Sequence, residues 1–321
     1  MSEVAVVIPN FNGMIYLEDC LAALQNQSNQ EFEVILVDNG SKDESVSYVK
    51  EHYPQVRILE LEHNYGFCRA VNAGIRATEA PFTILLNNDT KVDSGFVKAL
   101  LEGIKKRPGC FSCSAKMLKM SAPDQIDDAG DYYCALGWAY AWGQGQPEKN
   151  YNRPRKIFSA CGGAAIYRNA VFWEIGFFDE KHFAYLEDMD IGYRAKIYGY
   201  ENYYLPEAVV YHVGSGTTGS RYNEFKIRYS SRNNIYMIYK NMPLLQILIN
   251  MPCLLAGFLI KIAFFTAKGF GSEYRKGLRA GIRMSLHGEK VKYQKKHFRN
   301  YCKIQVELFV NLGKRLGNRL T

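Results

Sequence analysis

Two nucleotide-binding loops that begin many α/β enzymes are missing from this chain at the places where they are expected. No Gly-x-Gly-x-x-Gly motif follows the first apolar run, Val4 to Ile8, and the sequence has no Gly-Lys-Ser/Thr loop. Because such loops hold dinucleotides and nucleoside triphosphates, neither a dinucleotide-dependent enzyme nor a P-loop nucleotidase is supported.

The cysteines lack the pattern of a disulfide framework or a zinc site. There are eight, without a repeating spacing, and Cys110 and Cys113 have no second pair at zinc-site spacing. No secretory signal precedes the first apolar run. We therefore expect a reduced, cytosolic catalytic domain in which Cys110 and Cys113 are structural thiols.

Acidic residues are scarce at the C-terminal end. From Leu244 onward there are 15 Lys or Arg against 3 Glu, a balance of +12, whereas the preceding residues carry 25 basic against 29 acidic side chains, a balance of −4. A slightly acidic body with a basic, apolar tail argues against nucleic acid as a partner. It favours an anionic membrane surface instead.

The first half contains a regular alternation of strand-like and helix-like runs. Strands are predicted at residues 4–8, 33–37, 56–61 and 82–86, and helices at 15–27, 44–52 and 67–77. This order predicts βαβ units and a parallel sheet in an α/β fold. The 321 residues, 47% of them hydrophobic, suffice for a catalytic domain over 1–240 and a helical C-terminal region over 241–321.

Each predicted strand ends in a cluster of polar residues. The clusters are Pro9-Asn10-Phe11-Asn12, Asp38-Asn39-Gly40-Ser41, His63-Asn64-Tyr65-Gly66 and Asn87-Asn88-Asp89. Any one of them is explained equally well by a turn, which favours Asn, Asp, Gly and Ser. Four in successive βα units indicate a binding crevice, because ligands of open α/β sheets bind at the carboxyl ends of strands.

Several ordered motifs over residues 3–240 resemble glycosyltransferase family 2, in its bacterial rhamnosyltransferase-like branch. They are Val-Val-Ile-Pro-Asn-Phe-Asn-Gly (6–13), Val-Asp-Asn-Gly-Ser-Lys-Asp (37–43), Asn-Tyr-Gly-Phe-Cys-Arg-Ala-Val-Asn-Ala-Gly (64–74), Leu-Leu-Asn-Asn-Asp-Thr (85–90), Phe-Asp-Glu (178–180) and Tyr-Leu-Glu-Asp-Met-Asp-Ile-Gly-Tyr-Arg (185–194). The resemblance implies a GT-A fold, in which a Rossmann-like nucleotide-binding sheet is joined to an acceptor-binding half. It also implies inversion at the anomeric carbon.

The resemblance also implies where the nucleotide sugar binds. The residues expected around it are Pro9, Asn12, Asp38, Asn64, Arg69, Asn72, Asn87, Asn88, Gly162 and Gly163. The carboxylate of Asp38 can accept a hydrogen bond from the imide N–H of uracil or thymine, so it suits either pyrimidine. The glycine pair also fits an ordinary bulge, and the nearby Trp138, Tyr140 and Trp142 fit either sugar stacking or plain packing.

The metal motif of the family, Asp-x-Asp, reads Asn87-Asn88-Asp89 here, so an amide replaces the first carboxylate. Asp89 and the diphosphate still offer the oxygen ligands that Mg²⁺ or Mn²⁺ prefers. A lone histidine is usually structural, but the resemblance implies that His212 completes the metal site. The loop after it, with Gly214, Gly216 and Gly219, is expected to close over the diphosphate.

The acidic run 187–190 supplies the expected catalytic groups. The resemblance implies that Asp188 is the catalytic base. It also implies that Glu187 either binds an acceptor hydroxyl or holds Asp188 in place. Without the resemblance, Asp188 fits equally well as a favourable negative charge at a helix N-terminus. Asp190 and Arg194 are spaced for an i,i+4 ion pair, so we expect Asp190 to be structural.

The apolar run Leu244 to Ala267 is long enough to cross a bilayer. Its interior Pro252, Gln246, Asn250 and Lys261 favour a buried helix pair or an interfacial segment. The Lys- and Arg-rich stretch that follows favours a membrane-surface element over a solvated helix face or an oligomer contact. We therefore expect peripheral attachment to the inner face of the cell membrane, with a homo-oligomer as an alternative use of the region.

These inferences combine into one expected activity. We expect an inverting, metal-assisted hexosyltransferase that moves a sugar from a dTDP- or UDP-sugar, with dTDP-rhamnose favoured, to a lipid-linked bacterial surface glycan. One alternative is a UDP-hexose or UDP-N-acetylhexosamine transferase on the same fold. Another is a non-catalytic module that binds sugar nucleotides or glycans.

Overall fold

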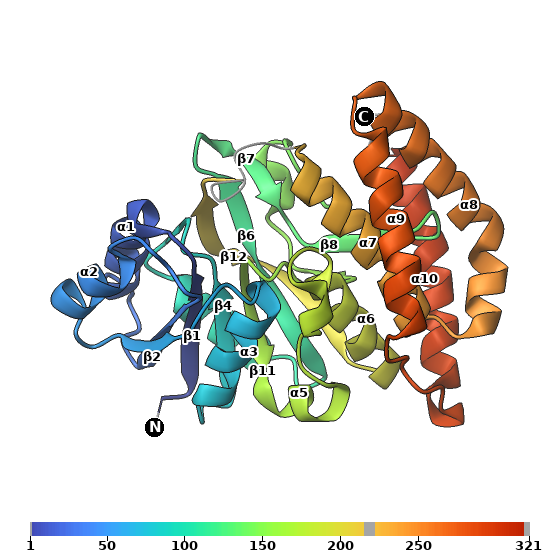
Figure 1. The fold of residues 1–321 in the computed structure, drawn as a ribbon. Helices are drawn as coiled ribbons and strands as arrows, with labels where there is room; N and C mark the ends of the chain where they lie inside the picture. Colours follow the sequence, from blue (N-terminus) through green and yellow to red (C-terminus); the bar gives the residue numbers. More distant parts are fainter. Residues whose placement is uncertain (1, 215–221, 318–321) are drawn as a thin grey trace.

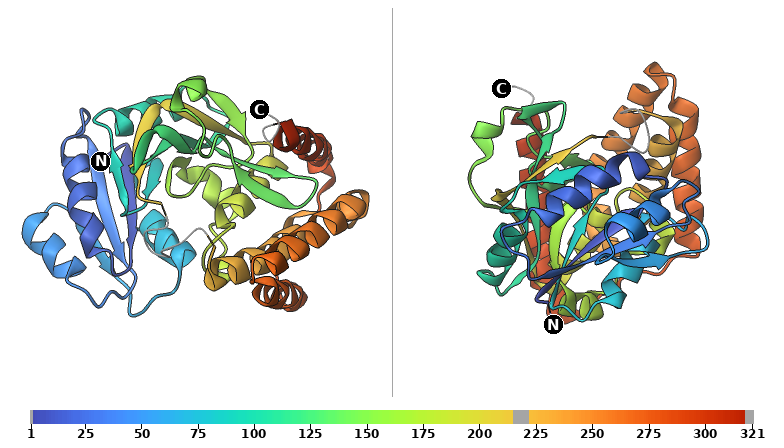
Figure 2. Two further views of the ribbon diagram at one scale, coloured as in Figure 1. Left: turned by 90° about the horizontal axis from the view of Figure 1, so that it is seen from above. Right: turned by 90° about the vertical axis from the view of Figure 1, so that its left-hand side faces the viewer.

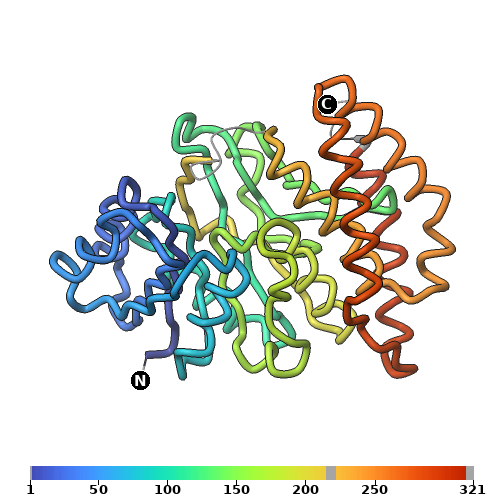
Figure 3. Tube along the Cα trace, in the orientation of Figure 1, coloured from blue at the N-terminus to red at the C-terminus, as the bar shows by residue number. Residues whose placement is uncertain are grey.

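A computed structural model describes residues 2–214 and 222–317 (Figures 1 and 3). The strands are β1 (Val4–Asn10), β2 (Phe32–Asp38), β3 (Arg57–Glu60), β4 (Phe82–Leu86), β5 (Thr90–Val92), β6 (Cys110–Lys119), β7 (Ala122–Asp128), β8 (Asp131–Cys134), β9 (Trp138–Ala141), β10 (Arg155–Ile157), β11 (Ala164–Arg168) and β12 (Glu201–His212). The helices are α1 (Met14–Gln25), α2 (Ser45–His52), α3 (Phe67–Ala77), α4 (Phe96–Lys105), α5 (Asn169–Ile175), α6 (Glu187–Tyr198), α7 (Glu224–Asn241), α8 (Leu244–Ala267), α9 (Gly271–Leu286) and α10 (Phe298–Gly317), with 3₁₀ turns at Glu148–Tyr151, Glu180–His182 and Lys295–His297.

The centre of the molecule is one mixed sheet in the order β10-β12-β6-β11-β4-β1-β2-β3, with β5 paired to β12 and β7 to β6. The predicted parallel arrangement of β3, β2, β1 and β4 is confirmed. β11 then runs antiparallel to both β4 and β6 and so joins this parallel part to the second half of the sheet. The expected α/β fold is therefore present, with a mixed rather than wholly parallel sheet.

Helices cover both faces of the sheet, which explains why its strands are apolar along their whole length. In β1, Val4, Val6 and Ile8 belong to one buried cluster, and Ala5 and Val7 to the cluster on the other face. The first face is covered by α1, α2 and α4, and the second by α3 and α5. Figure 2 shows these layers from two sides.

The C-terminal helices form a further layer on the side of the molecule away from β2 and β3 (Figure 1). A third buried cluster joins them to α6: Tyr193 of α6 packs with Met237 of α7, Leu254 of α8 and Leu308 of α10. α7 crosses the boundary that we expected at residue 240 and ends at Asn241. The region that follows is helical, as expected, apart from short connections.

A buried ion cluster fixes α6 against α7. Asp190, which is fully buried, accepts hydrogen bonds from Arg194 at 2.8 Å, Lys240 at 2.9 Å and Asn241 at 2.7 Å. The predicted Asp190–Arg194 pair is thus confirmed. Lys240 also reaches Asp179 at 2.7 Å. One carboxylate therefore connects α6, α7 and the segment that leads into α6.

Replacing Asp190 with alanine is expected to lower the free energy of unfolding by about 3–5 kcal/mol, because the buried cations would lose their partner. Urea unfolding followed by circular dichroism at pH 7 measures this. Burial would raise the pKa of Asp190, but Arg194 and Lys240 hold it well below its ordinary value. The contribution of Asp190 to the free energy of unfolding is therefore complete at pH values above the pKa that this residue has in the unfolded chain. It decreases as the pH falls below about 4.

The control for this variant is Asp19→Ala, at a side chain that is 70% exposed and 3.8 Å from Lys91. A surface pair of this kind contributes at most about 1 kcal/mol. An equal loss of unfolding free energy in the two variants would contradict a special role for the buried carboxylate of Asp190.

Candidate functional site

The strand ends of the first half meet at one edge of the sheet, as the polar clusters predicted. The β1–β2 register places Asn10 opposite Asp38. Asn10 Nδ2 donates to Asp38 Oδ1 at 3.0 Å, and Asn88 Nδ2 donates to Asn10 Oδ1 at 2.7 Å. Asn10 therefore links the polar clusters that contain Asp38 and Asn88 to the cluster at the end of β1. Its side chain, 1% exposed, was not singled out from the sequence, where it resembles any turn asparagine.

The loops around this edge are held by their own polar side chains. Asn12 follows Pro9 by three positions and has a φ of 50°; its Oδ1 accepts the Lys42 N–H at 2.7 Å. Asn64 Oδ1 accepts from Asn39 Nδ2 at 3.1 Å and from the Gly66 N–H at 2.9 Å. These contacts order the crevice before any ligand enters.

The two residues that we expected near the donor on α3 have different surroundings. The guanidinium of Arg69 lies 3.8 Å from the centre of the Tyr65 ring, next to the crevice loop. Asn72 is 1% exposed; its Nδ2 donates to the Phe178 carbonyl at 2.8 Å, and its Oδ1 accepts the Phe178 N–H at 3.1 Å. In the structure Asn72 thus anchors the Phe-Asp-Glu segment to α3.

Asp89 and His212 are brought together by the pairing of β5 with β12. The antiparallel register sets His212 opposite Thr90, the neighbour of Asp89. The Nε2 atom of His212 lies 3.4 Å from Oδ1 of Asp89, and both side chains are largely buried. A carboxylate oxygen and an imidazole nitrogen at this separation are ligands that Mg²⁺ or Mn²⁺ accepts, with diphosphate oxygens completing the set.

Asp127, at the end of β7, is a part of this site that the sequence did not indicate. Its Oδ2 lies 2.7 Å from Nδ1 of His212 and fixes the ring so that Nε2 points to Asp89. Burial would lower the pKa of His212, but the two carboxylates outweigh it and raise the pKa to about 9. A metal ligand must be the neutral imidazole, so metal binding here would release a proton.

Gly162 and Gly163 lie between Asn87 and Asp188. A Cβ on Gly163 would be 3.1 Å from Nδ2 of Asn87. A Cβ on Gly162 would be 3.3 Å from the Phe67 ring and 4.0 Å from Cβ of Asp188. The backbone therefore passes close to both Asn87 and Asp188, and side chains here would narrow the space between them.

Glu187 and Asp188 form the first turn of α6. Oδ1 of Asp188 accepts the N–H of Met189 at 2.7 Å. Burial raises the pKa of Asp188 above its ordinary value. Burial and, second, the charge of Asp188 also raise the pKa of Glu187, and its Oε2 is buried without a hydrogen-bond partner in the described structure. A carboxylate with a raised pKa is a stronger base, and a neutral neighbour can donate a hydrogen bond.

The loop before these carboxylates is strained. Phe183, Tyr185 and Leu186 all have positive φ angles, of 61°, 71° and 65°. Asn233 of α7 holds this loop: its Nδ2 lies 2.9, 2.8 and 2.7 Å from the carbonyl oxygens of residues 182, 184 and 185. Nη2 of the adjacent Arg232 donates to the carbonyls of residues 181 and 182. α7 therefore sets the entry of the chain into α6.

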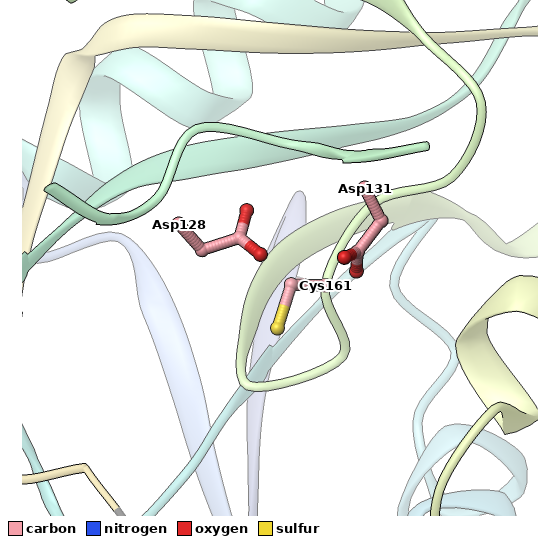
Figure 4. A group of neighbouring side chains, drawn as sticks. All are labelled: Asp128, Asp131 and Cys161. Carbon is pink, nitrogen blue, oxygen red and sulfur yellow. The ribbon is translucent and has the colours of Figure 1, made fainter. Parts of the chain in front are cut away.

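A third acidic group lies behind the site. Asp128, Asp131 and Cys161 converge from neighbouring segments, with their ligand-type atoms within 4.8 Å of one another (Figure 4). Asp128 also accepts the Gly130 N–H at 2.5 Å. Burial, and then repulsion by its acidic neighbours, raises the pKa of each carboxyl. We interpret the two as a pair of carboxyl groups that shares a proton.

Several other expected features can now be placed. Cys110 and Cys113 are buried free thiols with their sulfur atoms 3.5 Å apart. Tyr140 is buried against Tyr132, so its ring packs inside the protein. Gly214, with a φ of 73°, begins the expected loop over the diphosphate, whereas Gly216 and Gly219 lie outside the described residues.

Comparison with known proteins relates this geometry to a family. The model of the family described as Glycosyl transferase family 2 matches residues 5–176. The chain is 27% identical over 239 residues to N-acetylglucosaminyl-diphospho-decaprenol L-rhamnosyltransferase of Mycobacterium tuberculosis (strain ATCC 25618 / H37Rv), which covers 67% of this chain and 77% of that protein.

Two solved structures show the same fold at low sequence identity. GalNAc-T7 with UDP, GalNAc and Mn²⁺ superimposes with a TM-score of 0.61 at 16% identity, over 74% of this chain and 48% of that one. S. aureus TarS 1-349 with UDP-GlcNAc gives 0.56 at 15% identity, over 92% and 94%. The fold is GT-A. Since the family model covers more than half of the 321 residues, the chain belongs to glycosyl transferase family 2 and is a glycosyltransferase.

Proposed function

We propose that the chain is an inverting, metal-assisted glycosyltransferase that moves a hexose from a nucleoside diphosphate sugar to a lipid-linked surface glycan. The observation that carries this proposal is the occurrence of Asp188 beside Gly162 and of Asp89, paired with His212, two residues after Asn87, the neighbour of Gly163. Inversion requires a base on one face of the sugar and neutralisation of the leaving diphosphate on the other. The site has a group for each task.

In the proposed reaction, Asp188 accepts the proton of an acceptor hydroxyl as its oxygen attacks the anomeric carbon. The bond from that carbon to the nucleoside diphosphate breaks, and the diphosphate leaves with the electron pair. Glu187 donates a hydrogen bond to the acceptor or to Asp188, as its raised pKa favours. Asp89 and His212 would hold a divalent ion, which would supply positive charge for the leaving group.

We propose that Asn10, Asp38 and Asn64 form the nucleotide end of the crevice, with Pro9 and Asn12 beside them. Arg69, Asn87 and Asn88 lie next to these clusters toward the sugar. dTDP-rhamnose is the favoured donor, because the mycobacterial relative is named as an L-rhamnosyltransferase that acts on a decaprenol-linked N-acetylglucosamine. That name also supports a lipid-linked acceptor in a bacterial cell.

A UDP-N-acetylhexosamine donor is the second candidate, since TarS was solved with UDP-GlcNAc and GalNAc-T7 with UDP and GalNAc. A panel of dTDP-rhamnose, UDP-glucose, UDP-galactose, UDP-N-acetylglucosamine and GDP-mannose separates the candidates. We expect a selective rise of the melting temperature with the true donor that is larger with Mn²⁺, together with slow nucleotide release. Binding without any nucleotide release would favour a non-catalytic module, and no shift with any donor would contradict the proposal.

The variant Asp188→Asn tests the base. Its transfer rate is expected to fall by about 10²–10⁴-fold, the usual contribution of a general base, while the donor still raises its melting temperature. In the native enzyme, kcat should increase with pH along an acid limb centred above the ordinary value of 3.8, because the pKa of Asp188 is raised. A variant that keeps its turnover would remove Asp188 from this role.

The variant Asp127→Asn tests the support behind His212. Losing the carboxylate that orients a ligand histidine typically costs about 10–100-fold in metal affinity. Titration with Mn²⁺ in the presence of donor, followed by the melting temperature, measures this affinity. Asp124→Asn, an exposed carboxylate on the same strand, is the control and should bind Mn²⁺ as the native chain does. Equal affinities in the two variants would show that Asp127 does not support the metal site.

A further inference from the structure

We infer that the exposed face of α8 is a docking surface for an anionic lipid bilayer, on which the helix lies flat. α8 is the outermost element of the C-terminal layer (Figure 1). It has a mean hydropathy of 2.1 over its most apolar stretch, of which 17% is buried. Its large exposed apolar side chains are Leu244, Leu245, Leu248, Ile249, Met251, Leu255, Leu259, Ile260 and Phe264.

The polarity of this helix is opposite to that of an ordinary surface helix, whose apolar side faces the core. Gln246, 5% exposed, accepts the Tyr193 hydroxyl at 2.9 Å, and Asn250, 0% exposed, pairs with Gln305 at 2.8 Å. Lys261, the only charged residue of α8, lies 5.8 Å from the Trp138 ring. These three polar side chains thus face the protein, and the exposed face is largely apolar, as in a helix bordered by hydrocarbon.

A transmembrane orientation does not fit the packing of α8. Its inner face is covered by α9, by α10 and by the loop between β8 and β9. A Cβ on Gly257 would lie 2.0 Å from the Leu136 carbonyl oxygen, and Trp138 Nε1 donates to the Gly257 carbonyl at 3.1 Å. If α8 crossed the bilayer, that loop and the arginines of α9 would enter the hydrocarbon with it, at a large cost. Among the described residues, α8 leaves one continuous face exposed, which fits a helix in the interface.

Charge favours lipid over a second copy of the chain as the occupant of this face. The region from Leu244 onward carries a balance of +12. Exposed cations lie on the elements beside α8, namely Lys268, Arg275, Lys276, Arg283, Arg299 and Lys303. Two copies that met through α8 would bring these charges together, whereas anionic headgroups neutralise them. Each Lys or Arg near such a surface contributes attraction.

The surface itself is defined by the fold, and its use beside a lipid-linked acceptor rests on the proposed function. Docking through α8 would hold the enzyme at the leaflet that carries such an acceptor. Vesicle binding and donor binding are separate measurements, so one can fail while the other succeeds.

The test uses the full-length chain and sedimentation with phosphatidylcholine vesicles that do or do not contain phosphatidylglycerol. The double variant Leu255→Glu/Leu259→Glu places two charges on the face. The control Ile15→Glu/Trp173→Glu makes the same change of charge at exposed apolar residues of α1 and α5. We expect the native chain and the control to bind anionic vesicles, and the α8 variant to bind at least about tenfold more weakly.

Retention of the donor-induced rise in melting temperature by the α8 variant would show that it is folded. Equal vesicle binding by the two double variants would overturn the inference. So would a native chain that ignores anionic vesicles but forms a dimer in sedimentation velocity that the α8 variant lacks, because the face would then bind a second copy. Vesicle binding without any donor binding would keep the surface and contradict the proposed function.

Discussion

The candidate site depends on one buried carboxylate that never touches the reacting atoms. Asp190 accepts hydrogen bonds from Arg194 of its own helix and from Lys240 and Asn241 of α7. Successive residues of an α-helix are turned by about 100°, so residues 188 and 190 project from nearly opposite sides. Because Asp190 is fixed toward the interior, Asp188 must face the crevice. The buried ion cluster thereby determines the orientation of the proposed base.

A second constraint acts one turn earlier in the chain. Positive φ angles at Phe183, Tyr185 and Leu186 cost roughly 1–3 kcal/mol each and persist only where the surroundings impose them. Asn233 and Arg232 impose them by binding the carbonyls of this loop. α7 is also the helix on which α9 packs. The C-terminal layer therefore supports the geometry of the proposed catalytic turn, residues 187–190, as well as presenting the α8 surface.

Much of the secondary structure was predictable, because each element is indicated by the pattern of apolar residues within its own segment. The ends of α3, β4 and α8 agree with the sequence because apolar periodicity starts and stops there. The contacts of Asp127, Asn10 and Asn233 were not predicted, since each side chain acts through a partner more than 25 positions away. Sheet register and helix packing set such contacts, and no spacing in a single sequence reports them. The family motifs indicated Asp89 and His212, and the β5–β12 register explains why they meet.

Asp127 also bears on the substitution at the metal motif. Asn87 keeps an oxygen but removes one negative charge from the Asp-x-Asp position. The carboxylate of Asp127, 2.7 Å from His212 Nδ1, returns a negative charge behind the imidazole. It makes the ring a better electron donor once the Nε2 proton has left. The same carboxylate raises the pKa of His212, so proton and metal compete for Nε2. The charge that compensates for Asn87 therefore makes the proposed metal affinity increase with pH.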